Sequence, residues 1–138
     1  MSEGPVAKVP FARHLLSWAP VALMMGVQVF LSSKSHLPDV LSVVSVPDKV
    51  LHASWFFLLG LLTYRAAREG EGCTGRRAVL VVVLGALLWG SSDELHQSFV
   101  PGRQVELGDV AADVAGAALA ALVAEPLLRR LGLLASPR

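Results

Sequence analysis

The sequence predicts an all-α integral membrane protein, a bundle of four transmembrane helices. Composition is the first reason, because 54% of the 138 residues are hydrophobic and only 17% are charged, whereas about a quarter of a soluble domain is charged. Distribution is the second reason, because the charged residues lie between and at the ends of four stretches almost free of charge. These stretches are Leu15–Ser33, Val50–Tyr64, Ala78–Ser92 and Val110–Ala124, the last interrupted only by Asp113.

The first stretch is long enough to cross a membrane, since a spanning helix needs about 20 mostly apolar residues. A cleaved signal peptide is the alternative, because Lys8 and Arg13 resemble its charged first region. The apolar run is long for such a peptide, however, and no clear cleavage site follows it. A soluble helical bundle is disfavoured because no stretch shows a broad polar face at helical spacing. We therefore expect one membrane domain over residues 1–138, with spans at about 14–33, 48–66, 78–97 and 108–128.

The other three stretches reach a spanning length only when polar residues at one end of each are included. An apolar run of about 15 residues is about 22 Å long as a helix, and the hydrocarbon core of a bilayer is about 30 Å thick. The polar residues that complete these stretches include Asp48, His52, Asp93, His96 and Asp109. We therefore expect ionisable groups at or slightly inside one membrane boundary, where their energetic cost suggests a function.

The positions of lysine and arginine predict the orientation of the spans, because positive residues accumulate on the cytoplasmic side. Nine of the 12 lie before the first span, between the second and third, or after the fourth, and these segments must share one side. Only Lys34, Lys49 and Arg103 lie on the other side. We therefore expect both termini in the cytoplasm. Residues 32–49 and 93–109 would then face outward from a bacterial cytoplasmic (inner) membrane.

The second and fourth spans differ in the size of their side chains. The fourth is dominated by alanine and glycine, and small residues let helices approach closely in a membrane, so we expect it at the centre of the bundle. The second carries Trp55, Phe56 and Phe57, which we expect to contact lipid. Gln28, inside the first span, is expected to make a hydrogen bond between helices rather than to contact a ligand.

The net charge and the cysteine content argue against nucleic-acid binding and against cysteine-based cross-links or metal sites. A net charge of +1 at pH 7 provides no basic face of the kind that nucleic acids bind. The single cysteine, Cys73, allows neither a disulfide within the chain nor a cysteine-based metal site. The expected partners are the lipid bilayer and, within it, a lipid-linked cell-envelope precursor or a lipid headgroup.

Three of the spans carry polar residues in pairs near the same predicted membrane boundary. Residues three or four positions apart share one face of a helix. The pairs are Asp48 with His52, Asp93 with His96 and Gln97, and Asp109 with Asp113. A Pro-Gly turn after the third span is expected to hold Arg103 beside them. We expect His52 and Asp109 to meet in one pocket, with His96 and Arg103 at its centre.

The third span, the turn and the fourth span together form a long motif. It reads Asp93-Glu94-Leu95-His96-Gln97-Ser98-Phe99-Val100-Pro101-Gly102-Arg103, followed by Asp109 and Gly116. This run resembles the signature of the VanZ-like family of membrane proteins. Residues 48–52 resemble that family's second motif and Leu31-Ser32-Ser33 its first, whereas Asp113 stands where many members carry asparagine.

The resemblance extends over about residues 31–116 and implies a bacterial multi-pass membrane protein. The family takes its name from a member linked to resistance to the glycopeptide teicoplanin. A connection with the cell envelope or with glycopeptide resistance is therefore expected for this chain. The resemblance implies no settled biochemical activity.

Three interpretations of the polar residues remain open. In the first, they are structural: Arg103 and Lys49 pair with the aspartates and tie loops to helix ends, since buried charges need partners. In the second, they form the active site of a membrane enzyme, phosphatase-like or hydrolase-like, that acts on a lipid-linked phosphate. In the third, they bind a lipid headgroup, a lipid-linked cell-envelope precursor or the antibiotic itself, without catalysis.

The roles expected of individual residues follow from their chemistry. The candidate catalytic residues are Asp48, His52, Asp93, His96 and Asp109, and the candidate ligand-binding residues are Lys49, Glu94, Gln97, Arg103 and Asp113. A divalent metal ion is the candidate cofactor, because oxygen and imidazole ligands suit several divalent ions. Its expected ligands are Asp93 and His96, with His52 and Asp109 completing the set. Arg103, Asp109 and Asp113 also repeat the R-x5-H-x3-D spacing of the type 2 phosphatidic acid phosphatases. In that family the histidine is the nucleophile, and Asp109 stands in its place.

Overall fold

The structure is a computed structural model that describes residues 10–35 and 46–134. It contains four helices, α1 (Phe11–Ser32), α3 (Asp48–Glu71), α4 (Arg76–Gln97) and α5 (Leu107–Arg130), and no strand within those residues. Each helix is long and apolar enough to cross a membrane. The prediction of an all-α chain with four candidate spans is therefore confirmed. The largest difference from the predicted bounds is in α3, which continues past residue 66 to Glu71.

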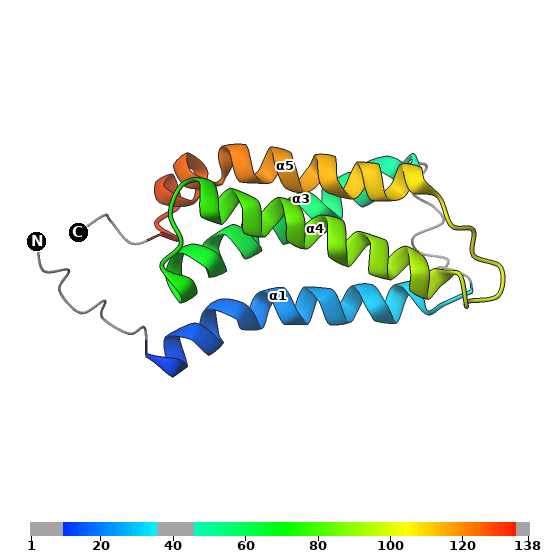
Figure 1. The fold of residues 1–138 in the computed structure, drawn as a ribbon, viewed down its shortest axis with the longest axis horizontal. Coiled ribbons are helices and arrows are strands. Elements are labelled where there is room, and N and C mark those ends of the chain that lie inside the picture. The colour runs from blue at the N-terminus through cyan, green and yellow to red at the C-terminus, as the bar shows by residue number, and fades with distance from the viewer. Residues whose placement is uncertain (1–9, 36–45, 135–138) are drawn as a thin grey trace, which may run out of the picture.

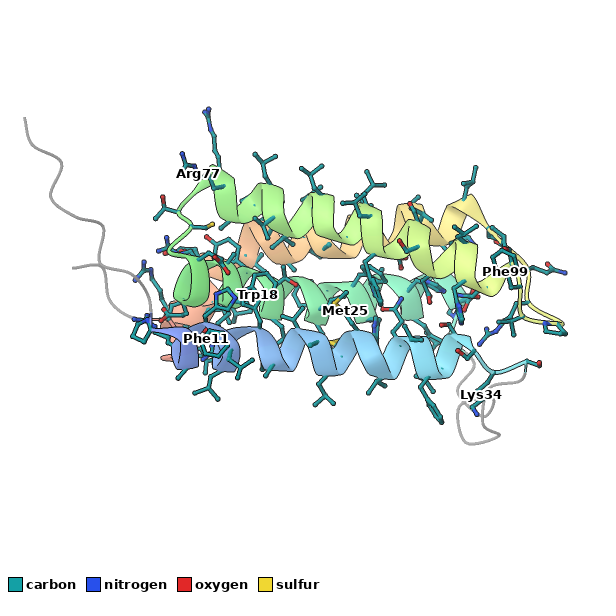
Figure 2. All side chains as sticks on the ribbon, turned by 60° about the horizontal axis from the view of Figure 1, so that its bottom comes forward. Phe11, Trp18, Met25, Lys34, Arg77 and Phe99 are labelled. Atoms are coloured by element: carbon teal, nitrogen blue, oxygen red, sulfur yellow. The ribbon has the colours of Figure 1, made fainter. Side chains whose placement is uncertain are left out.

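The helices run alternately in opposite directions, so that the start of α1 and the end of α5 lie at the same end of the bundle (Figure 1). The other end contains the ends of α1 and α4 and the starts of α3 and α5. We call this the polar end and define it as residues 31–35, 46–52 and 93–109. Figure 2 shows Lys34 and Phe99 at the polar end, with Phe11 and Arg77 at the opposite end.

Helix α3 is the centre of the bundle, because α1, α4 and α5 all pack against it. Helix α1 makes few contacts with α4, and within the described helices it does not pack against α5, which lies on the far side of α3 and α4 (Figure 1). The expectation that the aromatic residues of the second span contact lipid is wrong for Phe56, which is 1% exposed. Its burial follows from the central place of α3, since neighbouring helices cover the face that carries it.

Small residues allow α3 and α5 to pack closely. A Cβ atom at Gly116 would lie 2.1 Å from the main-chain oxygen of Ala53, and one at Gly60 would lie 2.9 Å from the Cβ atom of Ala120. The buried face of α5 includes Ala117, Ala120, Ala121 and Ala124. Such close approach supplies van der Waals contact where lipid offers no hydrophobic driving force. The small residues of α5 therefore pack it closely against α3, and α3 rather than α5 occupies the central place that was expected for the fourth span.

Helix α1 is attached to α3 near both of its ends by polar contacts. At the end away from the polar end, Arg13 pairs with Glu69, and the indole nitrogen of Trp18 donates to Glu71 at 2.9 Å. Toward the polar end, the indole nitrogen of Trp55 donates to Gln28 at 2.9 Å. These contacts hold α1 against α3 across much of the length of the candidate span.

Candidate functional site

Helix termini account for several of the charged residues at the polar end. Asp48 and Asp109 lie in the first turns of α3 and α5, where a carboxylate is stabilised by the partial positive charge of a helix amino terminus. The Arg103 guanidinium donates to the main-chain oxygens of Leu31 at 3.1 Å and Lys34 at 3.0 Å. Positive charge is favourable there, because these carbonyl groups lie at the carboxyl end of α1.

His52 is held in place by a buried carboxylate. Its Nδ1 atom lies 2.9 Å from Oδ1 of Asp113, and Asp113 is 1% exposed. Its Nε2 atom lies 4.0 Å from Asp48 and 3.9 Å from Asp109. Helix α4 makes room for Asp113 with a glycine, since a Cβ atom at Gly90 would lie 2.6 Å from Oδ2 of that carboxylate. The imidazole therefore has one nitrogen fixed by Asp113 and the other between two carboxylates.

Lys49 and Glu94 hold the segment that leads into α5. The Lys49 ammonium donates to Asp109 at 2.9 Å and to Glu106 at 2.7 Å. The main-chain N–H of Glu106 in turn donates to the Glu94 carboxylate at 2.9 Å. These bonds connect the start of α3, the end of α4 and the start of α5.

Gln28 and Asp93 form a second polar group, between α1 and α4. The Gln28 amide nitrogen donates to Oδ2 of Asp93 at 3.1 Å, and Gln97 donates to the same oxygen at 3.0 Å. The Gln28 amide oxygen accepts from the indole nitrogens of Trp55 at 2.9 Å and Trp89 at 3.0 Å. The prediction that Gln28 makes a hydrogen bond between helices is therefore confirmed. It is one amide that contacts three other helical side chains.

One oxygen of Asp93 is left without a partner. Asp93 is 6% exposed, and its Oδ1 atom is buried with no hydrogen bond to any residue that the structure describes. Buried polar groups in proteins are nearly always hydrogen-bonded, and a buried carboxylate without donors carries a large desolvation cost. Among the residues that the structure describes, this oxygen is therefore the buried side-chain acceptor at the polar end that has no hydrogen-bond donor.

A cavity of about 420 Å³ lies between α1, α3 and α4 at the polar end, within the size range typical of small-molecule sites. Its polar lining residues are Gln28, Ser32, Asp48, His52, Ser54, Asp93, Gln97 and Arg103. Leu51 and Leu58 also line it and are 44% and 53% exposed. The cavity therefore combines polar groups with apolar side chains that lie at the bundle surface.

A family model described as VanZ/LLP1 matches residues 9–129. The chain belongs to the VanZ/LLP1 family. Comparisons with curated proteins and with solved structures found no match. The resemblance drawn from the Asp93–Arg103 motif is therefore confirmed, and the matched range contains every residue that lines the cavity.

In this VanZ/LLP1 chain the cavity gathers half of the predicted site residues. Those that line it are Asp48, His52, Asp93, Gln97 and Arg103. Lys49, Asp109 and Asp113 do not line it, but they contact one another or His52 beside it. His96 does not line it either, and its Nε2 atom instead lies 2.9 Å from the hydroxyl of Ser33. Of the four residues expected in one pocket, His52 and Arg103 line the cavity, whereas His96 and Asp109 do not.

Of the four residues predicted as metal ligands, the structure brings His52 and Asp109 together, joined by Asp48, but not Asp93 and His96. Ligand atoms of Asp48, His52 and Asp109 lie within 4.8 Å of one another, and such a set of oxygen and imidazole donors suits several divalent ions. Asp93 and His96 belong to other contacts, the first to Gln28 and Gln97 and the second to Ser33. Asp109 also accepts from Lys49, so the ammonium already supplies positive charge to this trio.

Two residues of the first span contribute to the cavity although they were not candidate site residues. Gln28 and Ser32 lie on α1 and line the cavity beside Asp93. A signal for Gln28 was present in the sequence, since it is the single amide within an otherwise apolar span and intramembrane polar residues tend to face the bundle interior. Ser32 belongs to the Leu31-Ser32-Ser33 motif, which carried no assigned chemistry.

Proposed function

We propose that this VanZ/LLP1 protein binds the polar headgroup of a membrane lipid in the cavity at its polar end, on the outer face of a bacterial cytoplasmic membrane. The unpartnered oxygen of Asp93 is the observation that carries this proposal. A ligand that donates a hydrogen bond to it would satisfy the one buried side-chain acceptor that the described residues leave without a partner. The family's link with teicoplanin resistance supports a role in the cell envelope.

A purely structural role explains the positions of the neighbouring charged residues better than it explains the position of Asp93. Asp48 and Asp109 lie at helix amino termini and Arg103 caps a carboxyl terminus, so each stabilises the fold where it lies. Asp93 lies near the carboxyl end of α4, where a negative charge gains nothing from the helix dipole. Because its position costs free energy and leaves one oxygen unpaired, a functional role accounts for it better than a structural one.

The lining favours a headgroup that donates hydrogen bonds, such as an ammonium group or sugar hydroxyls. Asp48 and Asp93 both contribute carboxylates, which repel a bare phosphate. Two nitrogens of the Arg103 guanidinium already donate to main-chain oxygens at the end of α1. The guanidinium therefore cannot also form the paired hydrogen bonds of a bidentate phosphate contact. The exposed side chains of Leu51 and Leu58 at the cavity would allow such a lipid to enter directly from the bilayer.

Replacing Asp93 with asparagine should weaken headgroup binding by about tenfold or more, because the loss of one charge-assisted hydrogen bond is worth about 1.5–3 kcal/mol. The measurement is titration of the full chain, in phosphatidylcholine nanodiscs, with glycerophosphoethanolamine and with methyl glucoside. Binding of only the first would identify an ammonium ligand, and binding of only the second a sugar. Glu71→Gln, at the opposite end, is the control and should bind as the unmodified chain does. Equal binding by the Asp93→Asn variant and the unmodified chain would refute the proposal.

Hydrolysis of a lipid-linked phosphate is the second candidate function, and the His52–Asp113 pair favours it. An imidazole whose Nδ1 atom is held by a buried carboxylate, while Nε2 remains available beside a cavity, has the arrangement of a general base. Mass spectrometry of lipids incubated with the protein separates the two candidates. Product formation that His52→Gln abolishes would establish an enzyme, whereas binding without product would leave the first proposal.

The orientation proposed here places residues 93–109 outside the cell. In a Cys73→Ser background, Ser98→Cys should react with a membrane-impermeant maleimide in intact cells, because Ser98 is exposed at the polar end. Thr74→Cys, exposed in the α3–α4 connection, is the matched control and should react only after the membrane is permeabilised. The reverse labelling pattern would invert the topology and place the cavity at the cytoplasmic face.

A further inference from the structure

A second cavity lies beside the polar one along the axis of the bundle. It has a volume of about 170 Å³ and also lies between α1, α3 and α4, with Ala117 of α5 in its lining. Its lining is almost entirely apolar and includes Val21, Met25, Leu59 and Val82. Phe56 lines both cavities. The two spaces are therefore neighbours that share a wall at Phe56.

The same face of α1 lines both cavities. Its lining residues are Trp18, Val21 and Met25 in the apolar cavity and Gln28, Leu31 and Ser32 in the polar one. Steps of three or four residues connect Trp18, Val21, Met25 and Gln28, and Leu31 and Ser32 follow Gln28 by three and four residues, which places all six on one stripe of a helix. In Figure 2 Trp18 and Met25 lie between α1 and the neighbouring helices. A helix rises about 1.5 Å per residue, so the stripe from Trp18 to Ser32 is about 21 Å long.

The boundary between the two cavities is built from groups with one polar and one apolar part. Trp55 lines the polar cavity and Trp89 the apolar cavity, and both indole nitrogens donate to the Gln28 amide oxygen. The indole rings leave apolar surface beside these N–H groups. The lining thus changes from carboxylates to hydrocarbon near Gln28, as the surface of a lipid changes between headgroup and chain.

We propose that the apolar cavity holds one hydrocarbon chain of the lipid whose headgroup lies in the polar cavity. This inference rests on the headgroup binding proposed above. The apolar cavity has a volume of about 170 Å³, which suits a single hydrocarbon chain rather than the pair of a diacyl lipid. The ligand would then be a single-chain amphiphile, or a lipid that inserts one chain, with hydrogen-bond donors in its headgroup.

Gly85 provides a way to fill the apolar cavity without disturbing the polar one. It lines the apolar cavity, and a Cβ atom added there would meet no atom within 4 Å. Gly26 on α1 is the matched control, because an added Cβ atom there also meets nothing within 4 Å and it lines neither cavity. Gly85→Leu and Gly26→Leu therefore add the same side chain at two positions where the new Cβ atom has room. Of the two positions, Gly85 borders the apolar cavity and Gly26 does not.

The test measures binding of palmitoyl lysophosphatidylethanolamine and of glycerophosphoethanolamine to the full chain in phosphatidylcholine nanodiscs. Gly85→Leu should weaken binding of the lysolipid by at least tenfold and leave binding of the chainless headgroup unchanged, whereas Gly26→Leu should change neither. Unchanged lysolipid binding by Gly85→Leu would overturn the inference and leave headgroup binding intact. If the unmodified chain binds neither of these probes nor methyl glucoside, the proposed function is overturned as well.

Fluorescence of the tryptophans locates the chain independently of any loss of folding in Gly85→Leu. All three tryptophans of the protein, Trp18, Trp55 and Trp89, line the cavities. A lysolipid brominated near the chain terminus should quench the unmodified protein, and Trp18→Phe should remove most of that quenching. Bromine near the headgroup should quench both proteins alike. Equal quenching of both proteins by the terminal bromine would place the chain outside the apolar cavity and overturn the inference.

Discussion

Replacing Gly116 with alanine should destabilise the bundle by about 3 kcal/mol or more, the upper part of the range for overpacked cores. The added methyl group would lie 2.1 Å from the main-chain oxygen of Ala53. No side-chain rotation can relieve this contact, because the opposing atom belongs to the backbone of α3. Helices α3 and α5 would have to separate, and the start of α3 carries His52. Unfolding in mixed detergent micelles of increasing sodium dodecyl sulfate content measures the change.

Gly26→Ala is the control for this prediction. The substitution adds the same methyl group within a helix, but the new atom meets nothing within 4 Å. Since alanine favours a helix over glycine by about 0.8–1 kcal/mol, this variant should be as stable as the unmodified chain or more so. If both variants unfold alike, the close contact of α3 and α5 is not what stabilises the bundle.

Replacing Gln28 with leucine should loosen α1 from the rest of the bundle and cost about 2–4 kcal/mol, because a buried polar group left unpaired costs about 1–3 kcal/mol. The substitution removes the acceptor of Trp55 and Trp89 and one donor to Asp93. Leucine is close to glutamine in size, so the loss is of hydrogen bonds rather than of volume. The same detergent unfolding assay reports it.

Gln104→Leu is the matched control for Gln28→Leu, since Gln104 is exposed in the segment between α4 and α5. It should leave stability within about 0.5 kcal/mol of the unmodified chain, as surface substitutions usually do. A Gln28→Leu variant of unchanged stability would show that Asp93 and the two indoles find other partners. The Gln28 network would then not be what attaches α1 at this depth.

The fold was predictable because long apolar stretches in a short chain leave few arrangements. The end of α3 was harder to predict, because its last turns carry the charged residues Arg68, Glu69 and Glu71. Charged residues after an apolar stretch favour the prediction of a loop outside the membrane. Those residues stay helical because they have partners: Arg68 contacts Glu125, and Glu69 contacts Arg13. Phe56 was misplaced for a related reason, because composition shows that a helix is apolar and not which of its faces another helix covers.

The sequence predicted at which end of the bundle the candidate site residues lie. It did not predict which side of each helix faces the cavity. Spacing correctly grouped Asp93, His96 and Gln97 near one end of α4, yet Gln97 and Asp93 line the cavity and His96 does not. The path of α1 decides this, because Ser33 meets His96 one helical turn beyond the point where Gln28 meets Asp93. A single sequence carries no information about that path, so the role of α1 in the cavity became visible only in three dimensions.

The attachment of α1 through Gln28 has a consequence for biosynthesis. Gln28 leaves the ribosome among the first membrane-embedded residues, but its partner Asp93 follows 65 residues later. At synthesis rates of about 5–20 residues per second, the amide waits about 3–13 seconds in or near the translocon with that partner not yet made. Trp55 can bond the amide oxygen once α3 is made, but the amide nitrogen still lacks Asp93, and membrane chaperones and proteases can recognise such an unpaired polar group. Ribosome stalling between α3 and α4 should therefore leave a fragment that is degraded faster than the finished chain.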